Sequence, residues 1–227
     1  QNFNNILNRL ENKMKWKKEK IKLLKTIKKI LEEKLVIGTW GNFSIRINDN
    51  LFIITPSGMD YKKIKLKDLV VMDINEEIVE GKRKPSVEYF LHLSIYKSRN
   101  DVNGICHTHS DFAKVFSILR KPIPPVCEDL VQVVGGEVPV APYFLPGSKE
   151  LGINCAKTLN NKNAVILANH GLVSCGRTID EALKIAEVVE RNSKTIVFSY
   201  ILGQPIKLDQ NDIDIMRDFY LNRYGQK

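Results

Sequence analysis

The sequence predicts an α/β protein, because segments with strand periodicity and segments with helix periodicity alternate along most of its 227 residues. Composition agrees with a globular chain, since 43% of the residues are hydrophobic and 27% are charged. A chain of this length can bury most of the surface that it exposes when unfolded. We therefore expect a single domain over residues 1–227 that is large enough to enclose an active site.

A basic amphipathic helix is expected first, at about residues 3–35. Its clearest part, KMKWKKEKIKLLKTIKKILEEK, places Ile21, Leu24, Ile27 and Leu31 at helical spacing. Lysines fill the other face and concentrate much of the net charge of +9 at this end of the chain. We interpret this as a solvated lysine face over an apolar stripe, with an RNA-binding or membrane-surface helix as the alternative. We expect no nucleic-acid partner and no membrane partner.

Three strand candidates follow the first helix. Residues 43–49, FSIRIND, alternate apolar and polar side chains after the glycine-flanked turn IGTWGN. LFIITPSGMDY, at 51–61, repeats the pattern of a strand that leads into a turn, and DLVVMDI, at 68–74, is the third candidate. The polar turn INEE and the basic loop GKRKP come next.

Helices and strands continue to alternate in the rest of the chain. A helix at residues 86–99 begins just after Pro85, which places Glu88 in its first turn. The other expected elements are a strand at 102–109, a helix at 111–119, a short strand at 137–143, a helix at 148–159, a strand at 163–171 that ends in a turn, and helices from about Ile179 to Leu202 and from about Gln210 to Tyr224.

The location of the protein is predicted from two absences in the sequence. It has no run of about 18 apolar residues and no signal-peptide core, so we expect a cytoplasmic protein. The cysteines lack CxxC spacing and are interpreted as buried thiols. They are Cys106, Cys127, Cys155 and Cys175.

Three of the four histidines stand where a strand gives way to a turn. His107 and His109 are two residues apart in a strand, so their imidazoles point to the same face, and His170 follows the apolar run AVILA. Three imidazoles leave one position open, which is typical of a catalytic zinc site, although iron, cobalt, nickel and manganese also accept imidazole. An HxH pair by itself is more often a surface or hydrogen-bonded feature. His92, four residues after Glu88, is interpreted as structural.

Five motifs occur in order: GTWGNFS, ITPSG, KPSVE, HTH and ANHG. Together they resemble the class II aldolase and adducin family, most of all its L-fuculose-1-phosphate aldolase branch, from about Gly38 to the end of the chain. The resemblance implies a three-layer α-β-α fold with a mainly antiparallel central sheet, in a homo-oligomer that is commonly a tetramer with active sites between subunits. It also implies zinc-dependent cleavage of a ketose 1-phosphate, like L-fuculose 1-phosphate, to dihydroxyacetone phosphate and an aldehyde.

The same resemblance assigns roles to individual residues. It implies that His107, His109 and His170 bind zinc and that Glu88 is the catalytic acid and base. Glycine lets a backbone approach a ligand closely, and hydroxyl and amide groups donate to phosphate oxygens, although GN and SG are also everyday turn sequences. The positions that match phosphate-binding residues are Gly41, Asn42, Ser57, Gly58 and Ser86.

Some positions depart from the L-fuculose-1-phosphate aldolase pattern. Val87 replaces a second serine, which removes one hydroxyl contact to phosphate. The tyrosine that a neighbouring subunit contributes in that aldolase has no counterpart here, where Glu128 and Asp129 stand. Tyr224 is the candidate for its role in proton transfer, with an exposed tail tyrosine that has no function as the alternative. Trp40 replaces a small residue and either reshapes the pocket or packs in the core.

Three other functions stay open at this point. The same metal site could dehydrate a methylthioribulose-type sugar phosphate, since such enzymes can share the glutamate. Epimerisation of a pentulose phosphate is less favoured, because family epimerases usually have aspartate in place of Glu88. A non-catalytic, adducin-like interaction domain is disfavoured by the complete histidine triad.

Overall fold

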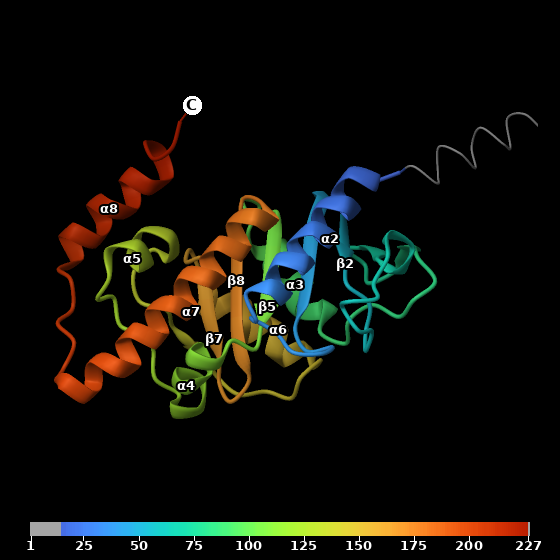
Figure 1. Cartoon of the computed structure of the whole chain (residues 1–227). Helices are drawn as coiled ribbons and strands as arrows, with labels where there is room; N and C mark the ends of the chain where they lie inside the picture. The colour runs from blue at the N-terminus through green and yellow to red at the C-terminus, as the bar shows by residue number, and fades with distance from the viewer. Residues whose placement is uncertain (1–14, 227) are drawn as a thin grey trace, which may run out of the picture.

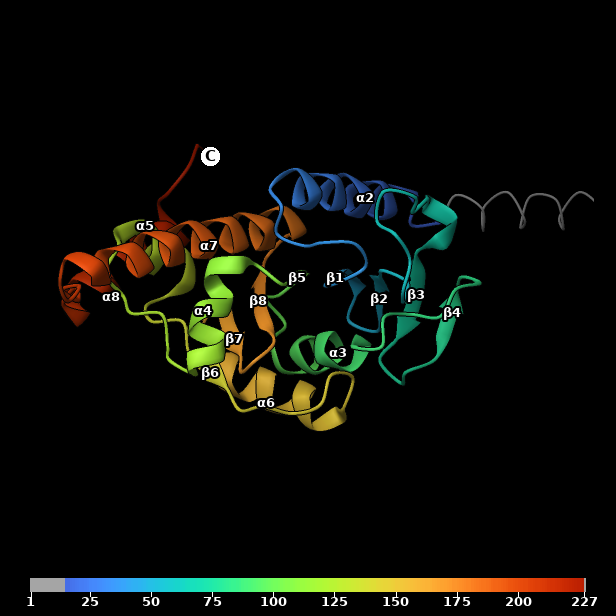
Figure 2. The same cartoon turned by 60° about the horizontal axis from the view of Figure 1, so that its bottom comes forward.

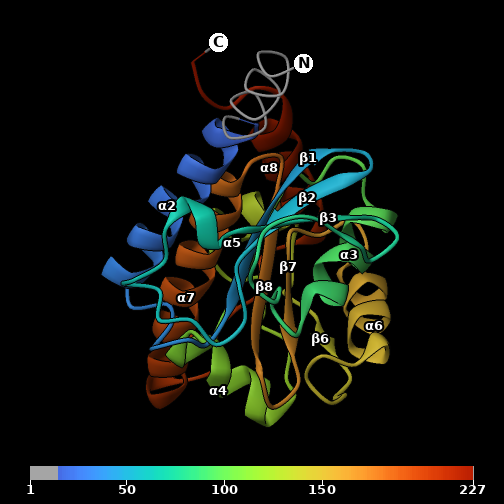
Figure 3. The same cartoon turned by 90° about the vertical axis from the view of Figure 1, so that its right-hand side faces the viewer.

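The computed structural model describes residues 15–226, which form a mixed sheet between two layers of helices (Figure 1). Figure 3 shows α2 (Lys17–Glu32) and α7 (Ile179–Leu202) on one face of the sheet, and α3 (Tyr89–Ser98) and α6 (Lys149–Leu159) on the other. The expected α/β class is confirmed. The first part of the expected N-terminal helix, residues 3–14, lies outside the described residues.

The sheet has eight strands in the order β4-β3-β2-β1-β5-β8-β7-β6. Every neighbouring pair is antiparallel except β6 and β7, which are parallel. The sheet is therefore mainly antiparallel, as expected, with one parallel pair at its edge. The strands are β1 (Asn42–Asn48), β2 (Leu51–Ile54), β3 (Val70–Asp73), β4 (Ile78–Glu80), β5 (Gly104–Thr108), β6 (Val140–Ala141), β7 (Ala164–Leu167) and β8 (Gly171–Gly176).

The helices α4 (Asp111–Leu119), α5 (Glu128–Val134) and α8 (Gln210–Asn222) complete the layer that contains α7 (Figure 2). A short 3-10 helix at Leu66–Asp68 precedes β3. Sequence periodicity did not predict β4, β8 or α5. β4 has three residues and α5 has seven, about two turns, so neither shows a clear period. β8 is buried at all six positions, so its sequence does not alternate between apolar and polar residues.

Alternate side chains of the central strands supply two separate cores. In β5, Ile105 joins the core under α3 and α6, whereas the adjacent Cys106 joins the core under α2 and α7. In β7, Val165 and Ile166 divide between the two cores in the same way. This alternation is what a strand buried on both faces requires, and it holds the middle of the sheet rigidly between the helices.

The buried face of α2 differs from the expected stripe by about one position. Leu23, Ile27 and Ile30 are its most buried apolar residues, while Leu24 and Leu31 are only partly buried. The expected face differs because Lys20 lies in the buried row of the helix, where the sequence pattern predicts an exposed lysine. Its side chain forms an ion pair with Glu80 of β4.

The interpretation of the cysteines is confirmed for three of the four residues. Cys106, Cys155 and Cys175 are buried, while Cys127 is half-buried. Within residues 15–226 we find no helix that has both the length and the apolar composition to cross a membrane.

Candidate active site

The three predicted histidines converge at one end of the central strands. His107 lies in β5, His109 directly follows it, and His170 lies in the turn between β7 and β8. The Nε2 atom of His107 is 3.2 Å from the Nε2 atoms of both His109 and His170. Each of the three residues offers a ligand atom to the same point, as the sequence predicted.

Hydrogen bonding and burial keep these imidazoles in the form that binds metal. The Nδ1 atom of His107 donates to the carbonyl oxygen of Leu172 at 3.1 Å, so its Nε2 atom carries the lone pair. Burial lowers the pKa of His107 and of His109 to about 3, and it also lowers the pKa of His170. All three rings are therefore neutral near pH 7.

The position of His170 is fixed by neighbouring elements. Its backbone N–H donates to the hydroxyl of Ser117 in α4 at 2.9 Å, and that hydroxyl donates to the carbonyl oxygen of Leu167 at 2.6 Å. Asn169, just before it, has a φ of 55°, a conformation that asparagine tolerates better than most residues. Sequence reasoning missed Ser117, because nothing in DFAKVFSIL marks this serine as facing a turn fifty residues away.

Glu88 lies beside the triad but not in the first turn of α3, where it was expected. It occupies the position just before the first residue of α3, with φ −99° and ψ 19°, and its side chain makes no capping hydrogen bond to this helix. The isolated bridge between Pro56 and Pro85 holds the preceding chain extended, so the helix begins at Tyr89. The carboxylate oxygens of Glu88 lie 3.4 Å from Nε2 of His107 and 3.5 Å from Nε2 of His170.

This cluster fits a divalent metal ion. With His107 protonated on Nδ1, its Nε2 presents a lone pair to the point where the other two imidazoles meet, and a carboxylate adjoins them. Glu88 Oε1 and His170 Nδ1 are buried and have no hydrogen-bond partner in the described part of the chain. An unpaired buried carboxylate oxygen is costly, and a cation held by His107, His109 and His170 would stabilise Glu88 Oε1.

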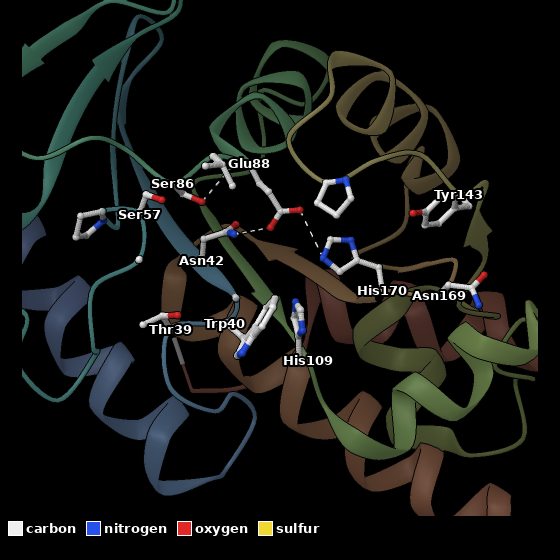
Figure 4. A pocket seen from close by; sticks show the side chains of 15 residues that line it. Thr39, Trp40, Asn42, Ser57, Ser86, Glu88, His109, Tyr143, Asn169 and His170 are labelled. Atoms are coloured by element: carbon white, nitrogen blue, oxygen red, sulfur yellow. Dashed lines mark hydrogen bonds and ion pairs between the residues drawn. The ribbon is translucent and has the colours of Figure 1, made fainter.

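The remaining predicted residues lie around the same cavity of about 450 Å³ (Figure 4). In Figure 4 the serines and Asn42 occupy one side of the pocket, and His109 and His170 occupy the other, with the Glu88 carboxylate between Asn42 and His170. The pocket brings together all five residues that match phosphate-binding positions. They are Gly41, Asn42, Ser57, Gly58 and Ser86.

Two glycines in this region have no room for a side chain. A Cβ atom on Gly41, which has a φ of +79°, would lie 2.6 Å from the carbonyl oxygen of His107. The hydroxyl of Tyr61 donates to the carbonyl of Gly41 at 2.6 Å and anchors this turn. A Cβ on Gly171 would lie 2.4 Å from the carbonyl oxygen of Thr108. Sequence analysis had not singled out Tyr61 or Gly171.

We expect Gly171→Ala to weaken metal binding, because the added methyl group pushes β8 away from β5 and displaces His170. Changes to residues that support a metal ligand typically lower metal affinity about 10- to 100-fold. Titration with zinc measures the effect, and Gly203→Ala is the control, since a Cβ there meets no atom within 4 Å. Wild-type zinc affinity in Gly171→Ala would show that the contact with β5 does not hold the site.

Apolar and aromatic side chains form another part of the cavity wall, which also includes the polar Thr39 and Asn169. Trp40, Val87, Tyr143 and Pro146 line it, and the ring of Trp40 lies 5.6 Å from that of His109. The alternative that Trp40 packs in the core is wrong, because its side chain is 64% exposed.

Tyr224 is not brought into this cavity. It follows α8, is 59% exposed and stacks on Tyr220 with ring centroids 5.7 Å apart. No tyrosine lies in α5, the segment that carries Glu128 and Asp129. In the described part of the same chain, Tyr143 is the one tyrosine that lines the pocket.

Comparison with known proteins places these features in a family. Residues 21–197 match the family described as class II aldolase and adducin N-terminal domain. The chain is 34% identical over 211 residues to a 5-deoxy-D-ribulose 1-phosphate aldolase of Bacillus thuringiensis serovar kurstaki, covering 92% of this chain and 98% of the relative. It is 35% identical over 169 residues to an L-fuculose phosphate aldolase of Escherichia coli O6:H1, covering 74% and 78%. A solved structure of an L-fuculose 1-phosphate aldolase superposes with a TM-score of 0.86 at 39% identity, covering 89% of this chain and 95% of that one.

Proposed function

The chain belongs to the class II aldolase and adducin family and has the features of its aldolases, and we propose that it is a zinc-dependent aldolase that cleaves a ketose 1-phosphate. The products are dihydroxyacetone phosphate and an aldehyde, and the reverse reaction is the condensation of the two. The observation that carries the proposal is one pocket lined by His109, His170, Glu88 and residues of the GN, PSG and PSVE turns, with the buried His107 directly beside the two histidines and Glu88.

His107, His109 and His170 would hold the zinc ion, which would supply a Lewis acid that polarises the ketose carbonyl and stabilises the charge that develops on its oxygen. The protein's own part is to keep the three rings neutral and oriented. Burial and the hydrogen bond from His107 to Leu172 do this.

The phosphate group of the substrate would lie at the serine side of the pocket. The Ser86 hydroxyl accepts a hydrogen bond from the backbone N–H of Glu88 at 3.3 Å, so its own hydrogen is free to donate to a phosphate oxygen. No lysine or arginine lines this cavity within the described residues, so hydroxyl and backbone N–H groups near the start of α3 would carry the binding. Asn42 already donates to Glu88 through Nδ2 and has one further amide hydrogen to offer.

Glu88 would transfer the proton at C3 of the ketose. In cleavage the bond between C3 and C4 of the ketose breaks, the electron pair stays on C3, and Glu88 returns a proton to C3. In condensation Glu88 removes that proton. The hydroxyl on C4 loses its own proton as the aldehyde forms. Tyr224 remains the candidate for this second transfer, and because it lies outside the pocket of its own chain, it would have to come from another copy in the expected homotetramer.

The apolar wall suggests which ketoses suit the pocket. Trp40, Val87, Tyr143 and Pro146 offer contact area and, apart from the polar tips of Trp40 and Tyr143, no hydrogen-bonding side chains. 5-Deoxyribulose 1-phosphate, named for the Bacillus relative, and L-fuculose 1-phosphate, named for the solved structure, both end in a methyl group. We infer that the aldehyde portion of the substrate ends in a methyl group that packs against this wall.

We expect 5-deoxyribulose 1-phosphate to be cleaved with a kcat/KM about 10- to 100-fold higher than ribulose 1-phosphate, which differs by one terminal hydroxyl. Release of dihydroxyacetone phosphate measures both reactions, and Trp40→Ala should lower the ratio. Equal values for the two sugars would contradict the methyl preference. If neither sugar nor L-fuculose 1-phosphate gave dihydroxyacetone phosphate with zinc bound, the aldolase proposal would be wrong, and loss of water from methylthioribulose 1-phosphate would favour the dehydratase instead.

A further inference from the structure

Five buried polar side chains form a continuous line that ends at Glu88. Two of them lie two residues apart on β1, and three lie four residues apart at the start of α3 and within it. Both spacings place side chains on the same face of their element. Each is at most 6% exposed. The five residues are Asn42, Ser44, Glu88, His92 and Tyr96.

Every neighbouring pair in this line is at hydrogen-bond distance. Asn42 Nδ2 lies 2.8 Å from Glu88 Oε2, and Asn42 Oδ1 lies 2.6 Å from His92 Nε2. The other ring nitrogen, Nδ1, lies 2.6 Å from Ser44 Oγ, which is 2.7 Å from the hydroxyl of Tyr96.

Only one direction of donation satisfies all four contacts when Glu88 is ionised. A carboxylate can only accept, so Asn42 must present its NH₂ group to Glu88 and its oxygen to His92. His92 must then donate from Nε2. Burial lowers the pKa of His92 to about 3, so the ring is neutral and its Nδ1 accepts from Ser44. The Ser44 oxygen in turn accepts from Tyr96.

We propose that His92 is a positioning residue for Glu88, and that Ser44 and Tyr96 support it. The ring fixes which way the Asn42 amide faces, and this amide holds Oε2 of the carboxylate, while Oε1 has no hydrogen-bond partner among residues 15–226. This inference rests on the proposed role of Glu88, and it gives His92 more than the structural part that the sequence indicated. Without the ring, the Asn42 amide could turn over and present its oxygen to the carboxylate, which would push Glu88 out of place.

The test compares two substitutions of His92 in the zinc-loaded protein. His92→Leu removes both ring contacts at similar volume, and we expect kcat to fall about 10- to 100-fold, the cost of a misplaced acid-base group, while KM and zinc content stay near the wild-type values. His92→Gln can still donate an amide hydrogen toward Asn42 and should restore much of kcat. Wild-type kcat in His92→Leu would overturn the proposal.

Ser44→Ala and Ser174→Ala form a matched pair of variants that tests the inference if His92→Leu does not fold. Ser44 and Ser174 are both fully buried strand serines, and Ser174 donates to the carbonyl of Ala182 outside the line. We expect Ser44→Ala to lower kcat and Ser174→Ala to lower thermal stability alone. Equal kcat values in the two variants would contradict the inference.

A measurement that needs no activity separates this inference from the aldolase proposal. In protein labelled with ¹⁵N at histidine, His92 should carry its proton on Nε2 and none on Nδ1. A proton on Nδ1 would reverse the direction of hydrogen-bond donation along the line. It would overturn the inference even if the enzyme is an aldolase. If the tautomer is as expected but the wild-type protein cleaves no sugar phosphate, the proposed function fails and the orientation of Asn42 stands.

Discussion

Replacing Glu88 by glutamine is expected to lower kcat for ketose 1-phosphate cleavage by about 10²- to 10⁴-fold, the range of a lost general acid-base group. Glutamine keeps the size of the side chain and an oxygen that can accept from Asn42, but it cannot take up or release the proton. The triad is untouched, so zinc content should stay near one per chain. Initial rates of dihydroxyacetone phosphate release, with metal analysis of the same samples, measure both quantities.

Glu190 provides the control for the loss of a carboxylate. It lies on α7 and accepts the backbone N–H groups of Phe112 and Ala113, each at 2.9 Å. Glu190→Gln changes the same chemical group away from the pocket, and kcat should remain within about twofold, as expected for a distant site. If Glu88→Gln and Glu190→Gln had similar rates, Glu88 would not be the group that moves the proton.

His107→Asn should remove both metal and activity, and it is the substitution with the largest expected effect. The amide NH₂ of asparagine can replace Nδ1 in the hydrogen bond to Leu172, but nothing replaces the Nε2 ligand atom. Lewis-acid stabilisation is worth several kcal/mol, so kcat should fall by at least about 10³-fold. Zinc titration and cleavage assays on one preparation provide the measurement.

The two variants separate the roles of the site. Glu88→Gln should keep zinc and lose activity, whereas His107→Asn should lose both, and thermal unfolding of the metal-free proteins checks that each chain folds. A His107→Asn protein that bound one zinc ion and cleaved substrate at the wild-type rate would exclude the triad as the metal site.

Much of the fold could be predicted because its longer elements carry clear periodicity. The α7 helix and strands such as β1 and β5 appear close to their expected positions. β4 and α5 were missed because they are too short to display a period, and β8 was missed because it is buried on both faces and its sequence does not alternate. The buried face of α2 was misplaced because a buried lysine broke the apolar pattern, and its partner Glu80 lies sixty residues away.

The candidate site divides in the same way. The triad could be predicted because HTH and ANHG stand in order among the GN, PSG and PSVE turns. The HxH spacing alone was weak evidence. The supporting residues could not be predicted, because their contacts cross between elements: Ser117 reaches the His170 turn from α4, and Ser44 meets Tyr96 between β1 and α3. In the sequence, Ser44 is an ordinary polar position of an alternating strand.

Exchange of the donor-carbon proton of dihydroxyacetone phosphate tests the central claim most directly, because it needs no knowledge of the aldehyde. Wild-type protein with one zinc ion per chain, incubated with dihydroxyacetone phosphate in deuterated water, should replace one C3 proton by deuterium, as followed by proton NMR. Exchange should stop when a chelator removes the metal and return when zinc is restored. Zinc-loaded protein that binds dihydroxyacetone phosphate and leaves this proton in place would contradict the account of the triad and Glu88 as an aldolase site.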